Sequence, residues 1–256
     1  MALPICLRYA EIQRFTLGVE TVPPDLSHNS TDDLKQEILK LVEGNVSAPL
    51  SQKVKFYKST LAPLFASLSQ RNPFPGAEEQ VALVLGVWLP VWSTIPFIEI
   101  LPGRVREQSY QIFQDNGYYA NIARYAPGHR NSLFQAFSAF LLAYDFMLLQ
   151  KFVVQDGQWS IQNVGIEQAF RWRGIPLTPE MAEGWMTKIV RARLDKMDAP
   201  KAPDLSSLDR STAKKVGTSF LATPQLEHLY IDRDFRLVKS QRDQQRPSYT
   251  IAVRKP

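Results

Sequence analysis

The chain has 256 residues, of which 45% are hydrophobic and 21% charged, so it is long enough to bury the core of one large domain. Its 30 basic and 25 acidic side chains give a net charge of +5, spread too diffusely along the chain to indicate a nucleic-acid partner. A single cysteine, Cys6, excludes an intrachain disulfide, and the three histidines beside it form no zinc-type cluster. We therefore expect neither a metal site nor a cofactor.

The first third of the chain predicts a helical hairpin behind an arm. Residues 1–29 show no sustained period and end near a Pro-Pro pair, so we interpret them as an N-terminal arm. Residues 30–33 (STDD) are typical of a helix N-cap, apolar residues then recur at helical spacing, and Gly44 supplies a stop. A second helical pattern follows, in which Pro63 is expected to break the regular hydrogen bonding. The predicted hairpin covers residues 30–74.

From Val81 onward the pattern changes to short β-rich segments separated by turn signals. The Asn-Gly dipeptide at 116–117 and the Asp-Gly dipeptide at 156–157 are the strongest hairpin signals, because both favour the positive φ that tight turns need. Two final strands are predicted over residues 229–238 and 248–254. The pattern indicates an antiparallel sheet.

Turn geometry also predicts which residues pair. A two-residue turn at 156–157 pairs Val154 with Trp159 and Phe152 with Ile161 on an apolar face. The same construction on the turn at 116–117 pairs Tyr110 with Ala123 and Ile112 with Asn121. The second hairpin therefore has a clear inward face, whereas the inward face of the first is left open.

One amphipathic helix is predicted within the β-rich region, near residues 178–197. Thr178 and a following proline make a good helix start, and apolar residues then recur at helical spacing. The second half of this helix is basic. Its Trp185, Lys188 and Arg191 either form a surface for an anionic membrane or a protein partner, or belong to a helix that packs on the sheet with its charged side in solvent.

The common enzyme motifs are missing from the chain. It has no P-loop, no dinucleotide-binding glycine motif, no nucleophile elbow and no zinc-binding HExxH sequence. Asp232 and Asp234 form the one close carboxylate pair in a strand-rich region, and they are either an acid–base pair in a cleft or turn residues between strands. We expect no catalytic residues and no enzymatic activity.

Large aromatic residues occur in the predicted strands and are either core residues or the lining of an apolar pocket. A closed antiparallel sheet of about eight strands encloses room for one small ligand, which keeps the pocket interpretation open. The candidate ligand-binding residues on this interpretation are Trp92, Tyr110, Phe152 and Trp159.

Four segments together resemble a known family. Residues 86–94 (GVWLPVWST), 110–113 (YQIF), 230–237 (YIDRDFRL) and 248–254 (SYTIAVR) are similar, in this order, to strand signatures of the plastid lipid-associated protein or fibrillin family. The helical pattern at 30–74 also occupies the family's position. The resemblance spans roughly residues 30 to 256 and is weak between 127 and 225.

The resemblance implies an α+β fold, in which an N-terminal helical hairpin is followed by an antiparallel lipocalin-like β-barrel over residues 80–256 with an inserted amphipathic helix. It implies that Trp88 plugs the floor of the barrel and that Arg236 or Arg254 lies over its ring, an interaction worth roughly 1–2 kcal/mol when desolvated. The residues to which it gives a structural role are Gly86, Trp88, Asp232, Asp234 and Arg236.

We therefore expect non-enzymatic binding of an apolar isoprenoid or lipid, such as a prenylquinone, a carotenoid or a membrane lipid. The resemblance implies a peripheral place on the thylakoid membrane or on plastid lipid bodies, and the start at Met1 favours a cyanobacterial cytoplasmic protein. Three alternatives remain: a scaffold for a thylakoid-associated protein complex, a bilin or tetrapyrrole handler that uses Asp232 or Asp234, and an enzyme acting on a quinone or lipid.

Overall fold

The computed structural model describes residues 29–95, 104–127, 142–196, 224–241 and 246–254. Its helices are α1 (Thr31–Glu43), α2 (Leu50–Phe56), the π-helical turn η1 (Tyr57–Leu61), α3 (Ala62–Ser69), α4 (Ala77–Val84) and α6 (Pro179–Lys196). Its strands are β1 (Gly86–Ser93), β2 (Arg104–Phe113), β3 (Tyr118–Pro127), β4 (Leu142–Gln155), β5 (Gln158–Trp172), β6 (Gln225–Ile231), β7 (Phe235–Gln241) and β8 (Ser248–Arg254). The predicted arm lies outside the described residues.

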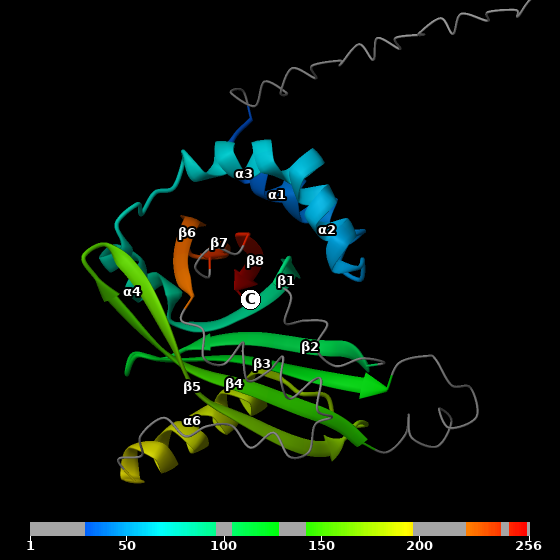
Figure 1. Ribbon diagram of the computed structural model, residues 1–256, viewed down its shortest axis with the longest axis vertical. Helices are drawn as coiled ribbons and strands as arrows, with labels where there is room; N and C mark the ends of the chain where they lie inside the picture. The colour runs from blue at the N-terminus through cyan, green and yellow to red at the C-terminus, as the bar shows by residue number, and fades with distance from the viewer. Residues whose placement is uncertain (1–28, 96–103, 128–141, 197–223, 242–245, 255–256) are drawn as a thin grey trace, which may run out of the picture.

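Each strand pairs antiparallel with the next one along the chain, and β8 pairs with β1, so the eight strands form a sheet that closes on itself. Helices α1, α2 and α3 cover the half of the sheet made by β6, β7, β8 and β1, and α6 covers the half made by β2 to β5 (Figure 1). The α+β class and the closed antiparallel sheet are therefore confirmed. Among the described helices none combines the length and the apolar character needed to span a membrane.

The predicted helices of residues 30–74 are present. Ser30 and Asp33 form a capping box at the start of α1, and the helix ends directly before Gly44, as expected. The second helix is irregular where Pro63 was expected to disturb it, because proline has no N–H to donate and the π-helical turn η1 precedes it. The apolar sides of these helices pack on the outer face of the sheet through one core cluster that includes Leu34, Ile38, Leu61, Phe65, Leu68, Tyr249 and Ile251.

In strand β1, a bulge reverses which side chains point into the closed sheet and which point outward. Its register with β8 shifts between Pro90 and Trp92, which leaves Val91 as an extra residue in a bulge. A bulge also accommodates Pro90, which cannot donate to a regular ladder. As a result Trp88 is buried inside the closed sheet, whereas Trp92 packs on the outer face, with its ring 6.5 Å from that of Phe65 in an edge-to-face contact.

The predicted register of the second hairpin is confirmed. Strands β4 and β5 pair Val154 with Trp159 and Phe152 with Ile161, and both turn residues have positive φ, 53° for Asp156 and 73° for Gly157. That combination is typical of a two-residue turn whose twist matches the strands.

The predicted register of the first hairpin is wrong by one residue. Strands β2 and β3 pair Tyr110 with Ile122 and Phe113 with Tyr119. The backbone N–H of Gln114 donates to the carbonyl of Tyr118 at 2.9 Å, so the turn contains three residues rather than two. The side chain of Asn116 accepts a hydrogen bond from the backbone of Tyr118 at 3.1 Å and closes this longer turn.

The expectation that β-structure begins at Val81 is also wrong, because residues 77–84 form helix α4. Glu78 and Glu79 lie in the first turn of this helix, where negative charge is favourable, and Val84 is fully buried at its end. The carbonyl of Val84 accepts a hydrogen bond from the indole of Trp88 at 2.7 Å. Helix α4 therefore covers one end of the closed sheet, and we refer to this as the closed end.

The predicted helix near residues 178–197 is confirmed as α6, and the hydroxyl of Thr178 caps it by accepting from the backbone of Met181 at 3.3 Å. Ala182, Met186 and Val190 form its buried side. They pack on the outer face of β2 to β5 in a core cluster with residues such as Ile112, Ile122 and Met147.

Candidate functional site

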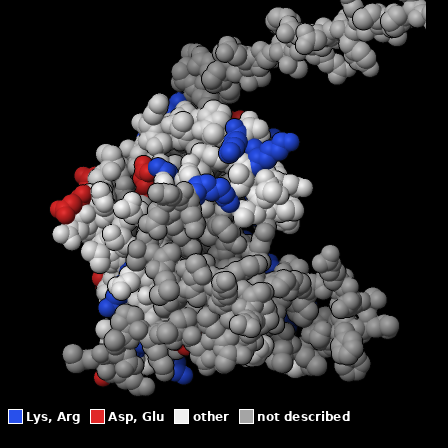
Figure 2. All heavy atoms as spheres, viewed as in Figure 1, with Lys and Arg blue, Asp and Glu red and all other residues white. Residues whose placement is uncertain are grey.

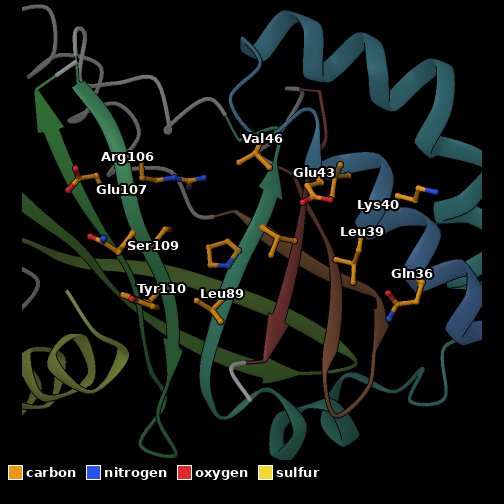
Figure 3. Close-up of a pocket in the computed structure, with 14 residues that line it drawn as sticks. Gln36, Leu39, Lys40, Glu43, Val46, Leu89, Arg106, Glu107, Ser109 and Tyr110 are labelled. Carbon is orange, nitrogen blue, oxygen red and sulfur yellow. The ribbon is translucent and has the colours of Figure 1, made fainter. Parts of the chain in front are cut away.

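The closed sheet has a weak seam between β1 and β2, and a cleft opens there. Only Gly86 to Trp88 of β1 pair with β2, after which the two strands diverge. The cleft has a volume of about 680 Å³, within the usual range for small-molecule sites. Its lining comes from α1 and the turn after it, from β1 and from β2 (Figure 3): Gln36, Leu39, Lys40, Val42, Glu43, Val46, Leu89, Pro90, Val91 and residues 106–110.

The walls of the cleft are largely apolar and its rim is charged. Leu39 and Val42 of α1 and Leu89 and Val91 of β1 contribute apolar side chains to the lining, and α1 adds the polar or charged side chains of Gln36, Lys40 and Glu43. Lys and Arg side chains gather over the neighbouring helices on one face of the molecule, as Figure 2 shows. This arrangement suits a ligand whose body is apolar.

Arg106 brings a cation to the cleft from β2. Figure 3 shows its side chain extending from β2 toward Val46 on the opposite side. Burial lowers the pKa of Arg106, while the neighbouring Tyr125 raises it. Gln108 brings an unpaired acceptor to the cleft, because its Oε1 is buried and has no hydrogen-bond partner among the described residues. The cleft thus offers a partly buried cation and an unpaired acceptor beside its apolar side chains.

The cleft borders the inner face of the sheet. Ser109 and Arg106 line the cleft, and their cross-strand partners Ala123 and Tyr125 point to the same side of the sheet as they do. On that side, β3, β4 and β5 carry an apolar wall, made of Ala123, Tyr125, Tyr144, Phe146, Leu148 and Ile166. We call this set the inner wall.

A chain of hydrogen bonds, which we call the polar layer, crosses the inner face next to this wall. Gln111 of β2 donates to Asn121 of β3 at 2.9 Å, Asn121 donates to Gln150 of β4 at 2.7 Å, and Gln150 donates to Asn163 of β5 at 2.6 Å. Arg236 of β7 joins the chain by donating to Oε1 of Gln111. Buried amides cost free energy unless they are hydrogen-bonded, and here they bond to one another.

Below the polar layer, aromatic rings fill the closed end. The rings of Phe113 and Tyr119 stack at 4.1 Å, and the ring of Phe152 lies 5.7 Å from Phe113 and 5.4 Å from Trp159. Two arginines lie over the ring of Trp88, with guanidinium carbons at 5.0 Å for Arg236 and 4.2 Å for Arg254. These residues form the floor of the closed sheet.

Helix α4 fastens this floor through Gln80. The side chain of Gln80 donates to the carbonyl of Phe74 at 2.8 Å, and its oxygen accepts from the indole of Trp159 at 3.0 Å. The same oxygen lies 3.1 Å from Nδ1 of His228. Burial lowers the pKa of His228 well below its usual value and the charge on Arg236 lowers it further, so this imidazole is neutral at pH 7.

The structure brings together two of the four candidate ligand-binding residues and separates the other two. Phe152 and Trp159 meet in the floor, where both are buried among other aromatic rings. Trp92 lies on the outer face beneath the helices. Tyr110 lies under α6, where its hydroxyl donates to the carbonyl of Leu177 at 2.6 Å, although it also borders the cleft.

Asp232 and Asp234 lie in the turn between β6 and β7. Oδ1 of Asp232 accepts from the backbone N–H groups of Asp234 at 2.9 Å and Phe235 at 2.7 Å. Its Oδ2 accepts from Lys35 at 2.7 Å and from the hydroxyl of Tyr230 at 2.8 Å. The carboxylate therefore has all four lone-pair sites occupied, which is the pattern of a turn residue rather than an acid–base group.

The predicted surface of α6 is only partly at the surface. Lys188 and Arg191 are exposed. Trp185 is half-buried, and the guanidinium of Arg171 from β5 lies 5.3 Å from its ring centre. Lys188 and Arg191 therefore lie in solvent, while Trp185 packs partly against β5.

Sequence reasoning missed the polar layer and the cleft. The signal for part of the polar layer was present, because extending the register that pairs Phe152 with Ile161 by two residues places Gln150 opposite Asn163 on the apolar face. Two facing amides on an inward surface predict a buried polar network. No local pattern indicated the cleft, since it depends on where β1 and β2 diverge.

Comparison with known proteins adds no identification: no model of a protein family matches the chain, and a search of curated proteins finds no match.

Proposed function

We propose that this protein binds an apolar isoprenoid or lipid, without catalysing a reaction on it, and that the ligand enters between β1 and β2. The observation that carries the proposal is the cleft of about 680 Å³, with its apolar walls and its position beside the inner wall. An apolar ligand placed there removes its surface from water, which is favourable by about 25 cal/mol for each Å² buried.

Binding without catalysis is supported by the chemistry of the candidate groups. Asp232 is fully hydrogen-bonded in a turn, and the amides of the polar layer bond to one another. Neither set supplies a general base poised over the cleft. The peripheral place on a photosynthetic membrane is part of the same proposal, and it rests on the family resemblance alone.

The proposal is tested by measuring affinity for methyl hexadecanoate, an apolar probe without charge. In the variant Ser109→Trp an indole enters the cleft, and we expect at least a tenfold loss of affinity. The matched control is Ser160→Trp, which puts the same indole on an exposed serine of β5. Equal affinity in the two variants contradicts binding in the cleft.

A protein partner is the second candidate function, and a different observation favours it. Phe170, Trp172 and Ile175, near the end of β5 and just after it, are 64%, 52% and 56% exposed. Exposed aromatic residues close together are typical of interaction surfaces. The variant Ile175→Glu, which leaves the inner wall unchanged, is then expected to lose a copurifying protein while it keeps its affinity for methyl hexadecanoate. If the variant still copurifies with the protein, this second candidate function is contradicted.

A further inference from the structure

Arg236 is a buried cation that lacks a counter-ion. Its side chain is 2% exposed, and its guanidinium carbon lies 5.0 Å from the ring centre of Trp88 and 4.7 Å from that of Phe113. One Nη donates to Gln111, but Nε is buried without a hydrogen-bond partner. No carboxylate of the described residues pairs with it, and isolated buried charges are strongly unfavourable.

The second arginine at Trp88 is different in this respect. Arg254 donates to the backbone carbonyls of Arg233 at 2.8 Å and Leu85 at 2.7 Å, and also to the carbonyl of Leu83. All of its guanidinium nitrogens are therefore hydrogen-bonded to the chain. Arg254 has a structural role that is complete within the protein, whereas the hydrogen bonding of Arg236 is incomplete.

The groups that face Arg236 leave its charge in place. Burial, opposed by Tyr119 and reinforced by the charge of Arg254, lowers the pKa of Arg236 to about 10, so the guanidinium is still charged at neutral pH. His228, diagonally across on β6, is neutral. Because Oε1 of Gln80 only accepts, Nδ1 of His228 carries the hydrogen. Its Nε2 is then an acceptor, which cannot donate a hydrogen bond to an anion in place of Arg236.

The position of Arg236 relates it to the proposed ligand path. It is bonded to Gln111, the first residue of the polar layer, which lies between the aromatic floor and the apolar inner wall. The next inward residue along β2 from Gln111 is Ser109, which lines the cleft. Arg236 is therefore the cation that a chain molecule would meet if it lay along the inner wall with its head toward the floor.

We propose that Arg236 binds the acidic head group of the ligand, a carboxylate or phosphate oxyanion, through its free Nε. This inference rests on the proposed function and names the class of ligand, an acidic amphiphile whose tail lies on the inner wall. Charge-assisted hydrogen bonds from arginine to oxyanions are among the strongest in proteins, and one here supplies the missing counter-charge.

The test compares hexadecanoate with methyl hexadecanoate, two probes of the same chain that differ in head-group charge, by calorimetry on the full chain at pH 8. We expect hexadecanoate to bind at least tenfold more tightly. In Arg236→Met this preference is expected to disappear, with the affinity for the ester nearly unchanged. The matched control is Arg254→Met, which removes the other arginine at Trp88 and is expected to keep the preference.

The outcomes separate the two proposals. If neither probe binds to the unaltered chain, both the proposed function and the role of Arg236 are overturned. If the acid and the ester bind equally, the proposed function stands and the oxyanion site is overturned, and this comparison needs no variant that must fold. If inorganic phosphate alone displaces hexadecanoate, the oxyanion site is supported, and its ligand is a free anion rather than the head group of a lipid. A loss of preference in Arg254→Met as large as in Arg236→Met contradicts a specific role for Arg236.

Discussion

Lys35 of α1 and Asp232 of the β6–β7 turn lie 197 positions apart in the chain, and the ammonium of one donates to the carboxylate of the other at 2.7 Å. This ion pair joins the helical layer to the sheet. Burial alone raises the pKa of Asp232 and lowers that of Lys35, but the hydrogen bond between them helps to reverse both shifts, together with the hydrogen bonds that Asp232 accepts from Tyr230 and from the turn backbone. Asp32, a second partner of Lys35 at 2.7 Å, adds to the effect.

We predict that Asp232→Asn destabilises the fold by about 1–3 kcal/mol at pH 7. Because the folded protein lowers the pKa of Asp232 below its unfolded value near 4, its contribution is complete above that value and is lost as the pH falls through the folded pKa. The variant should therefore lose less stability than the unaltered chain on acidification. Urea unfolding at pH 7 and pH 3 measures this, with Asp234→Asn in the same turn as the control. Parallel pH curves contradict it.

Gly86 provides the second prediction, because it has a φ of 98° and a Cβ there lies 3.0 Å from Nη1 of Arg254. Gly86→Ala combines a strained backbone with a displaced arginine, so we expect a loss of about 1–3 kcal/mol. Gly44→Ala is the control, since its φ is −69° and nothing lies within 4 Å of the added Cβ. Thermal unfolding of both variants decides it, and a similar melting temperature for the two contradicts the prediction.

Phe152 and its neighbour Val153 test whether the floor is core. Phe152 is 8% exposed among aromatic rings, whereas Val153 is 56% exposed on the other side of the strand. As a core residue, Phe152→Ala should cost about 3–5 kcal/mol, and Val153→Ala less than about 1 kcal/mol. Should Phe152→Ala leave the free energy of unfolding unchanged yet abolish the binding of methyl hexadecanoate, Phe152 lines a pocket instead.

The buried ion pair of Arg124 and Asp145 gives a fourth prediction. Two hydrogen bonds join them, Nε to Oδ1 at 2.6 Å and Nη2 to Oδ2 at 2.8 Å, and both side chains are almost fully buried. Arg124→Met leaves the buried carboxylate of Asp145 with Arg171 as its remaining ion-pair partner, at 3.1 Å, so the loss of the two hydrogen bonds should cost about 1–3 kcal/mol. The exposed pair of Lys239 and Glu227 is the comparison, and Lys239→Met should cost less than about 1 kcal/mol. Equal losses in denaturant unfolding contradict this difference.

The parts of the fold that depend on local chemistry could be predicted from the sequence. The Asp156-Gly157 turn fixed the register of its hairpin because both residues readily adopt positive φ. The turn at Asn116-Gly117 has the same kind of signature but closes with three residues, because the Asn116 side chain bonds to the backbone of Tyr118. A dipeptide does not distinguish these two turn lengths.

The candidate site depended on tertiary structure and was harder to predict. Trp92 was expected inside the sheet with Phe152, but a bulge beside Pro90 turns it to the outer face, and period-two counting cannot detect a bulge. That an arginine lies over Trp88 was implied only by the family resemblance, and two arginines lie there. The cleft depends on the divergence of β1 from β2, for which no local pattern exists.

The most direct test of the central claim is to map where a ligand lies. A methyl hexadecanoate that carries a diazirine on its chain is bound to the full protein, activated by light, and its attachment sites are identified by mass spectrometry. We predict labelling of Leu89, Val91 and Leu39 in the cleft and of Phe146 and Leu148 on the inner wall. Labelling that is absent from Leu39, Leu89 and Val91 contradicts the claim that the ligand enters between β1 and β2.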